Sequence, residues 1–456
     1  METTITPDEI FFYCHAPFDT GIILATVTTN KPEDLQAEAE NAASIMRAET
    51  KMNWEIEKSI TIVSADDEEF SFGGYNSPLA IGFLQVDILD QLSNKKLKFN
   101  HPAIGDIECE IDSANLYIHR FRTGIVNFRV KIPEAIWLDI PALSVLRNSL
   151  QTKTNFQAIF DPILIEIVNT LKQKLGDLSS PEFPSETFDF GITANLENPM
   201  YWSHSILCAY TPSDQVKKTG EFLSQALRKQ NPGHIENFAP PRANVFCFTD
   251  AGNSLVCVPS RHSEIEVKSW TRLIEIENYI YKVIWDLDHM LYMELTNISA
   301  SVRKNNNLNQ DLIRNRIHQL KRLSILLEIL IDDFAPRHLT VDFGRMHYLD
   351  LIFERWRMKN LLDDVRKKFE VLEELNQYII SRIQESSQQN LNRVLVLITV
   401  LTIVSVMTDS LALIEQIRSG SSDIINTVLL MLASLAIVLG LIFLVPYIRR
   451  RFNKID

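Results

Sequence analysis

The uncharged run VLVLITVLTIVSVMT, residues 394–408, decides how the rest of this chain is interpreted. It continues past Asp409 with further apolar residues, and a membrane-spanning helix is expected over residues 393–414. A second uncharged run covers residues 424–448, and at 1.5 Å per residue its length exceeds the roughly 30 Å hydrocarbon core of a bilayer. The sequence therefore predicts two transmembrane helices.

The charges around these runs predict an orientation. A short polar loop, residues 415–423, joins the two expected spans, so their outer flanks face the same compartment. Arg393 precedes the first span and a basic tail, residues 449–456, follows the second, whereas the loop carries only Arg418. Because basic residues concentrate on the cytoplasmic side, we expect a multi-pass protein of the inner (plasma) membrane with both ends in the cytoplasm. The alternative is that the runs are buried helices of a soluble protein.

Composition excludes several classes of function. The chain of 456 residues carries a net charge of −13, which argues against binding to nucleic acid because a phosphate backbone needs a basic surface. The first nine residues lack the basic and apolar regions of a signal peptide, so the part before the spans is expected in the cytosol. Cys14, Cys109, Cys208, Cys247 and Cys257 show neither a CxxC pair nor zinc-site spacing, and are interpreted as reduced core residues.

Apolar runs and helical patterns alternate in the first 262 residues. This part is interpreted as a mixed α/β cytosolic domain with a lobe boundary at residues 179–185. Strands are expected at residues 10–14, 22–27, 60–63, 116–119, 125–132, 205–210, 245–248 and 255–258, and helices at 32–49, 155–175 and 214–229.

Three long helical patterns follow, and residues 263–392 are interpreted as a helical stalk. The first covers residues 264–304 and the second 309–333. The third runs from residue 342 into the first expected span without a proline or glycine after Gly344. In it Met358, Val365, Leu372 and Ile379 recur every seven residues, which predicts a coiled-coil seam buried against other copies of the chain.

The expected fold class is thus a cytosolic α/β domain, a long α-helical stalk and two C-terminal transmembrane helices. This order resembles the CorA family of metal-ion transporters, most specifically over residues 270–456, where 375–407 resemble the family's stalk and pore helix and 448–454 its basic end. The resemblance implies a funnel-shaped homopentamer whose first spans line a pore. The family's Gly-Met-Asn signature is replaced here by VMTDSL, residues 406–411, so the element that holds a hydrated cation is missing.

Polar residues of the first expected span are candidates for lining such a pore. Thr399, Thr402, Ser405 and Asp409 fall within one arc of roughly 120° when successive residues are turned by 100°. An intramembrane carboxylate is costly and usually functional, and five of them would attract cations. The alternative is that the hydroxyl groups pack helices closely and bond backbone carbonyls. The candidates are Thr399, Thr402, Ser405, Thr408 and Asp409.

Two further clusters are candidates for binding a cofactor or ligand. Asp286, Asp288 and His289 supply oxygen and nitrogen ligands for a divalent cation such as Mg²⁺, although acidic pairs on helices are commonly only solvated. A second set offers cationic partners for a nucleotide-type, phosphate-bearing ligand, although ordinary surface pairing is the more common role of such residues. That set is His119, Arg120, Arg122 and Arg242.

No nucleophile elbow, P-loop, dinucleotide fingerprint or HExxH motif occurs, so no enzymatic activity is expected. Three hypotheses remain open. The first is a homopentameric ion channel gated by its cytosolic domain. The second follows from the resemblance, because divergent CorA-like proteins occur beside type III CRISPR systems as membrane effectors switched on by a nucleotide second messenger. The third is a membrane-anchored scaffold that conducts no ions.

Overall fold

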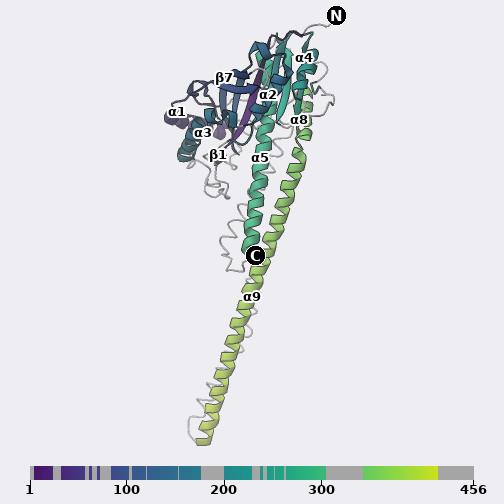
Figure 1. Cartoon of the computed structure of the whole chain (residues 1–456). Coiled ribbons are helices and arrows are strands. Elements are labelled where there is room, and N and C mark those ends of the chain that lie inside the picture. Colours follow the sequence, from purple (N-terminus) through teal and green to yellow (C-terminus); the bar gives the residue numbers. More distant parts are fainter. Residues whose placement is uncertain are drawn as a thin grey trace. The chain divides into compact units, whose positions relative to one another are not determined.

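The computed structural model describes most of the first 303 residues and a second stretch further on (Figure 1). The chain divides into two units, Met1–Leu372 and Glu373–Asp456, which are described separately. The described residues are 5–23, 32–56, 61–63, 69–71, 84–101, 105–119, 121–152, 154–175, 200–227, 237–239, 244–250, 252–260, 263–303 and 343–419.

A mostly antiparallel sheet organises the first unit. Within the described residues nine strands form it, in the order β10-β11-β9-β1-β8-β7-β5-β2, with β6 paired to β7. Only β9 and β11 pair in parallel. The strands are β1 Glu9–Ile23, β2 Glu55–Ile56, β5 Leu84–Asp87, β6 Lys96–His101, β7 Gly105–Ile118, β8 Phe121–Lys131, β9 His204–Thr211, β10 Phe246–Asp250 and β11 Asn253–Pro259, while β3 Thr61–Val63 and β4 Glu69–Ser71 form a separate pair.

The helices predicted at 32–49, 155–175 and 264–304 occur within one residue of those bounds, and the one predicted at 309–333 lies outside the described residues. α1 starts at Pro32, whose fixed φ suits a first turn, and Asp139 caps α2 by accepting a hydrogen bond from the Ala142 amide at 2.9 Å. The helices are α1 Pro32–Thr50, α2 Ile140–Gln151, α3 Thr154–Leu175, α4 Val216–Leu223, α5 Ser263–Arg303, α8 Phe343–Arg355 and α9 Met358–Ser419, with short 3₁₀ turns at Leu89–Gln91, Glu134–Ile136 and Ser224–Leu227.

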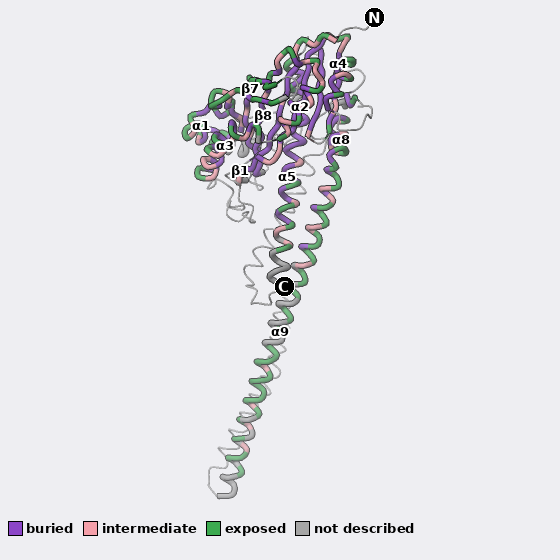
Figure 2. Tube along the Cα trace, in the orientation of Figure 1, coloured by how far each residue is buried: buried purple, intermediate pink, exposed green. Residues whose placement is uncertain are grey.

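The two faces of the sheet differ in chemistry, and β1 shows how. Successive side chains of a strand point to opposite faces. Ile10, Phe12 and Phe18 join the hydrophobic core with residues of α2 and α3, whereas His15 and Asp19 belong to the other face, against α5. Buried residues accordingly fill the sheet and the part of α5 beside it (Figure 2). The sequence prediction of a mixed α/β domain is confirmed.

The long third helix of the predicted stalk is broken. α8 ends at Arg355 and α9 begins at Met358, and Arg357 between them has a left-handed backbone with φ 55°. The carbonyl of Arg357 accepts the amides of Asn360 and Leu361, which starts the new helix. The prediction of an unbroken helix from residue 342 is therefore wrong. No proline or glycine marks the break, so the sequence carries no local signal for it.

The predicted fold class also needs correction. Among the residues that the structure describes, no helix combines the length and the apolar character needed to cross a membrane. The uncharged run 394–408 rises about 22 Å in a helix, short of the roughly 30 Å hydrocarbon core, and Asp409 ends it. Residues 415–419, expected in a loop, continue α9. The second expected span and the basic tail lie outside the described residues.

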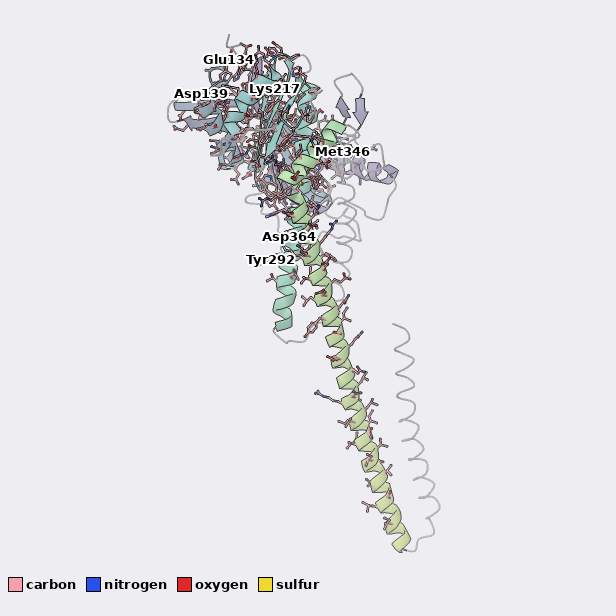
Figure 3. All side chains as sticks on the ribbon, turned by 90° about the vertical axis from the view of Figure 1, so that its right-hand side faces the viewer. Glu134, Asp139, Lys217, Tyr292, Met346 and Asp364 are labelled. Atoms are coloured by element: carbon pink, nitrogen blue, oxygen red, sulfur yellow. The ribbon has the colours of Figure 1, made fainter. Side chains whose placement is uncertain are left out.

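The first three residues of the predicted seven-residue seam are buried against other residues of the same chain. Met358, Val365 and Leu372 are fully buried within the first unit, where Lys368 of α9 also pairs with Asp288 of α5. Figure 3 labels Asp364 of this part of α9 and Tyr292 of the neighbouring stretch of α5. Over these residues the seam therefore gives no argument for other copies of the chain. The side chain of Ile379 lies outside the description.

Candidate functional site

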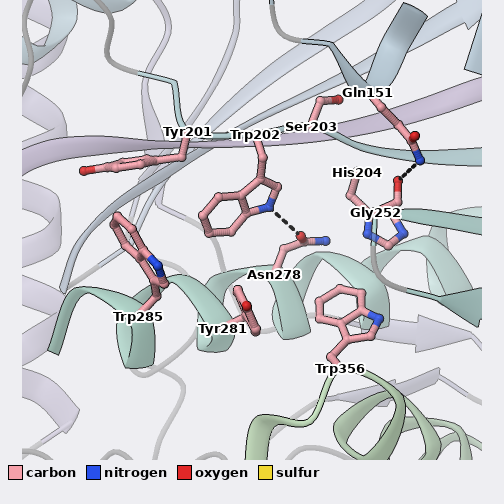
Figure 4. A pocket seen from close by; sticks show the side chains of 10 residues that line it. All are labelled: Gln151, Tyr201, Trp202, Ser203, His204, Gly252, Asn278, Tyr281, Trp285 and Trp356. Carbon is pink, nitrogen blue, oxygen red and sulfur yellow. Dashed lines mark hydrogen bonds between the residues drawn. The ribbon is translucent and has the colours of Figure 1, made fainter. Parts of the chain in front are cut away.

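An aromatic pocket of about 530 Å³ lies in the first unit, within the size range of small-molecule sites (Figure 4). Its aromatic walls come from three segments far apart in the sequence: residues 201–204, α5, and the junction between α8 and α9. Gln151 of α2 and Gly252, which precedes β11, also line it. Its lining residues are Gln151, Tyr201, Trp202, Ser203, His204, Gly252, Asn278, Tyr281, Trp285 and Trp356.

Three pairs of neighbouring rings in the pocket stand nearly at right angles to each other. The planes of Trp202 and Tyr281 meet at 84°, those of Tyr281 and Trp356 at 88°, and those of Trp202 and Trp285 at 79°. Edge-to-face contacts of this kind stabilise aromatic clusters and hold each ring in one orientation. Trp285 is 36% exposed and Trp356 9% exposed, so the pocket joins a surface ring to a buried one.

The polar groups of the pocket are uncharged. The indole nitrogen of Trp202 donates to the Asn278 side-chain oxygen at 3.3 Å, and the amide nitrogen of Gln151 donates to the Gly252 carbonyl at 2.8 Å (Figure 4). His204 hydrogen-bonds the Ser254 hydroxyl at 2.8 Å, and burial holds the pKa of its imidazole well below the ordinary value of 6.5. The imidazole is therefore neutral at neutral pH.

A buried group of four charges lies beside this pocket and is joined to it by Tyr201. Asp19 of β1 pairs with Arg122 of β8 at 2.9 Å, and the Tyr201 hydroxyl donates to the same carboxylate at 3.2 Å. On α5, Lys282 pairs with Asp286, and its ammonium lies 3.8 Å from the centroid of the Tyr201 ring. We call Asp19, Arg122, Lys282 and Asp286 the charge quartet; its formal charges sum to zero.

Burial and pairing oppose each other in the quartet. Burial works to raise the pKa of Asp19, but the positive charges of Arg122 and Lys282 outweigh it, and the pKa lies below its usual value. Burial lowers the pKa of Lys282 and raises that of Asp286, and their mutual attraction offsets only part of each effect. Arg122 also has φ 47°, an unfavourable conformation for a residue with a side chain. Strain held by tertiary contacts is common at functional sites.

A second polar network fixes α5 to the sheet one turn away from the pocket. His15 of β1 lies between the side-chain oxygen of Asn127 at 2.5 Å and the Thr271 carbonyl at 3.1 Å. Asn127 donates to Glu275, which also accepts from Arg272. Burial lowers the pKa of His15 to about 4, so the ring stays neutral at neutral pH. The polar side chains of α5 thus recur every three or four residues on the face that meets the sheet.

The residues predicted to bind a metal are separated by their pairings. Asp286 belongs to the charge quartet, Asp288 pairs with Lys368 of α9, and the His289 ring stacks on Trp285 at 5.8 Å between centroids. Within the described part of the chain no three His, Cys, Asp or Glu side chains gather as metal ligands. Asp286 and Asp288 therefore serve ion pairs in this structure.

The described residues predicted to bind a phosphate are engaged within the fold. Arg122 is committed to Asp19, and His119 is fully buried with its ring stacked on Tyr279 at 4.3 Å. Burial holds the pKa of His119 well below 6.5, which leaves no cation there for a phosphate at neutral pH. Arg120 and Arg242 lie outside the described residues.

The residues predicted to line a pore lie on α9. The hydroxyls of Thr399 and Thr402 donate to the carbonyls of Leu395 and Ile398 four residues before them, at 2.7 and 2.6 Å. This is the backbone bonding that the sequence left open as the alternative. Ser405, Thr408 and Asp409 follow on the same helix.

Sequence reasoning missed the aromatic pocket. Tyr281 and Trp285 are four residues apart on a predicted helix and so share one face, which was an available signal. Tyr201 with Trp202 was another, because two adjacent aromatic residues precede a predicted strand. Nothing in the sequence connects either pair with Trp356.

Comparisons with known proteins found no match for this chain. No family model matches the chain, and neither a curated protein nor a solved structure gives a significant match.

Proposed function

We propose that the Met1–Leu372 unit is a ligand-sensing module that binds a small planar molecule in the aromatic pocket and transmits binding to the start of α9. The observation that carries this proposal is the position of Trp356. It lines the pocket and at the same time forms the junction at which α8 ends and α9 begins.

The pocket walls support the binding step. Rings that stand at right angles leave flat faces on which a planar ligand can stack, and such stacking contributes roughly 1–3 kcal/mol per ring. Rings already held by their neighbours lose little conformational freedom when a ligand binds, which favours affinity.

The junction supports the transmission step. Trp356 contacts His204 of β9 at 5.1 Å and Tyr281 of α5 at 6.1 Å between ring centroids, so its position depends on both sides of the pocket. The next residue, Arg357, holds a left-handed backbone that costs about 1–2 kcal/mol. A ligand that contacts Trp356 in this conformation of the junction, and binds other conformations less tightly, will shift the population toward this one.

The other hypotheses from the sequence stay predictions. Ion conduction, a nucleotide-activated defence role, a scaffold role and a pentamer at the membrane are untested by the contacts described above. A ligand-sensing module is compatible with a gated protein of any of these kinds.

The binding step can be tested with benzimidazole, a planar ring that is uncharged at pH 7.5, and with cyclohexanol as a non-planar comparison. Saturation-transfer NMR with the full chain should show transfer to benzimidazole and little to cyclohexanol. Trp285→Ala should reduce benzimidazole affinity at least about tenfold, since it removes one stacking wall.

Tyr292→Ala provides the matched control, because Tyr292 is also an exposed aromatic residue of α5 but does not line the pocket. This variant should bind benzimidazole as the wild type does. Equal saturation transfer to benzimidazole from the wild type and from Trp285→Ala would mean that the ring binds elsewhere. The proposal would then be wrong.

A further inference from the structure

We infer that the ligand of the aromatic pocket is an uncharged heteroaromatic ring with an N–H group at its edge, such as a purine base. This inference rests on the proposed function and names the chemical class that the site takes. Three observations carry it, concerning cations, anions and the accessible hydrogen-bonding groups.

A cationic ligand meets a position that is already occupied. The Lys282 ammonium lies 3.8 Å from the centroid of Tyr201, so it already occupies the negative face of that ring, and 5.6 Å from the centroid of Trp285. The carboxylates of the charge quartet, Asp19 and Asp286, are paired with Arg122 and Lys282. A second cation would meet repulsion from Lys282 without a carboxylate of its own.

An anionic ligand lacks a partner in the same place. The two cations of the charge quartet, Arg122 and Lys282, are buried and paired, and none of the lining residues is Lys or Arg. Lining His204 is neutral because burial depresses the pKa of its imidazole. Bringing a phosphate into such a site would remove its hydration without replacing it, which is costly.

The polar edge of the pocket includes a hydrogen-bond acceptor. Gln151 is half-buried, and its amide nitrogen donates to Gly252, which turns the other end of the amide, a carbonyl oxygen, into the group that a ligand can use. Asn278 is buried, and its side-chain oxygen accepts from Trp202 while its side-chain nitrogen donates to the Ile274 carbonyl. A ring with an N–H donor therefore complements the pocket better than a hydrocarbon ring.

Titration calorimetry with the full chain at pH 7.5 tests this class with three probes: adenine, AMP and choline. Adenine should bind at least about tenfold more tightly than AMP, which has the same base and a phosphate, and choline should not compete with it. Gln151→Leu should weaken adenine binding about three- to tenfold, because it removes the acceptor but keeps a side chain of similar size.

The outcomes separate the inference from the proposed function. Tighter binding of AMP or choline, abolished by Trp285→Ala, would overturn the uncharged class and leave the pocket as a ligand site. Unchanged adenine affinity in Gln151→Leu would overturn the N–H edge. Absence of binding by all three probes and by benzimidazole at millimolar concentration would overturn both the class and the proposed function.

Discussion

Replacing Asp19 with asparagine should lower the free energy of unfolding by about 3–5 kcal/mol. The substitution keeps the size of the side chain but removes the charge that neutralises Arg122, which is buried against the sheet. An uncompensated guanidinium in a place that water does not reach is the physical origin of the loss. Chemical denaturation of the first unit at pH 7 measures it.

Asp90→Asn is the matched control for this variant. Asp90 also pairs with a basic residue, Lys95, but its side chain is 93% exposed. Exposed ion pairs contribute about 0–1 kcal/mol because solvent screens them, so this change should be small. A double variant, Asp19→Asn with Arg122→Met, should recover part of the loss. Similar losses at positions 19 and 90 would show that the charge quartet is not a buried, mutually dependent group.

Replacing His119 with phenylalanine should stabilise the protein, and more so in acid. Both ring nitrogens of His119 are buried without a hydrogen-bond partner among the described residues, while the ring stacks on Tyr279. Phenylalanine keeps the stacked ring and removes the buried polar atoms, which should raise the free energy of unfolding by about 1 kcal/mol at pH 8.

The pH dependence follows from the depressed pKa of His119. Below the unfolded value of 6.5 the unfolded chain binds a proton that the folded chain does not, so the wild type loses stability as the pH falls. The advantage of His119→Phe should therefore grow by about 1.4 kcal/mol for each pH unit below 6.5, until the folded histidine also protonates. Denaturation at pH 8, 6 and 5 measures this slope.

His347→Phe is the control, because His347 lies exposed on α8. That variant should stay within about 0.5 kcal/mol of the wild type at all three pH values. If His119→Phe and the wild type differ by a constant amount from pH 8 to pH 5, the buried ring titrates as it does in the unfolded chain, and the account of its burial is wrong.

The α/β part of the fold was predictable because its signals are local. Residues 10–14 of β1 form a short apolar run, α1 begins at a proline, and α3 and α5 carry periodic apolar stripes. The existence and type of these elements therefore follow from the sequence. The break at Arg357 was not predictable. Its left-handed backbone has no glycine or asparagine to announce it, and tertiary contacts such as those of Trp356 support it instead.

The site was not predictable for a related reason. Residues 201–204, the middle of α5 and Trp356 meet only after the sheet and the α8–α9 junction have formed. Two of the charged residues that the sequence suggested as ligand-binding groups, Asp286 and Arg122, form ion pairs with Lys282 and Asp19 instead. Whether a charge is free to bind a ligand depends on neighbours distant in sequence, which residue spacing does not reveal.

The central claim is that a ligand in the aromatic pocket acts on the start of α9. Hydrogen exchange of the full chain, with and without saturating adenine, tests it most directly. The account predicts slower exchange in peptides that cover residues 278–285 and 352–361, with no change in α3, whose residues do not line the pocket. Protection of 278–285 with unchanged exchange across 352–361 would contradict the claim, because the ligand would then bind the pocket without affecting the junction.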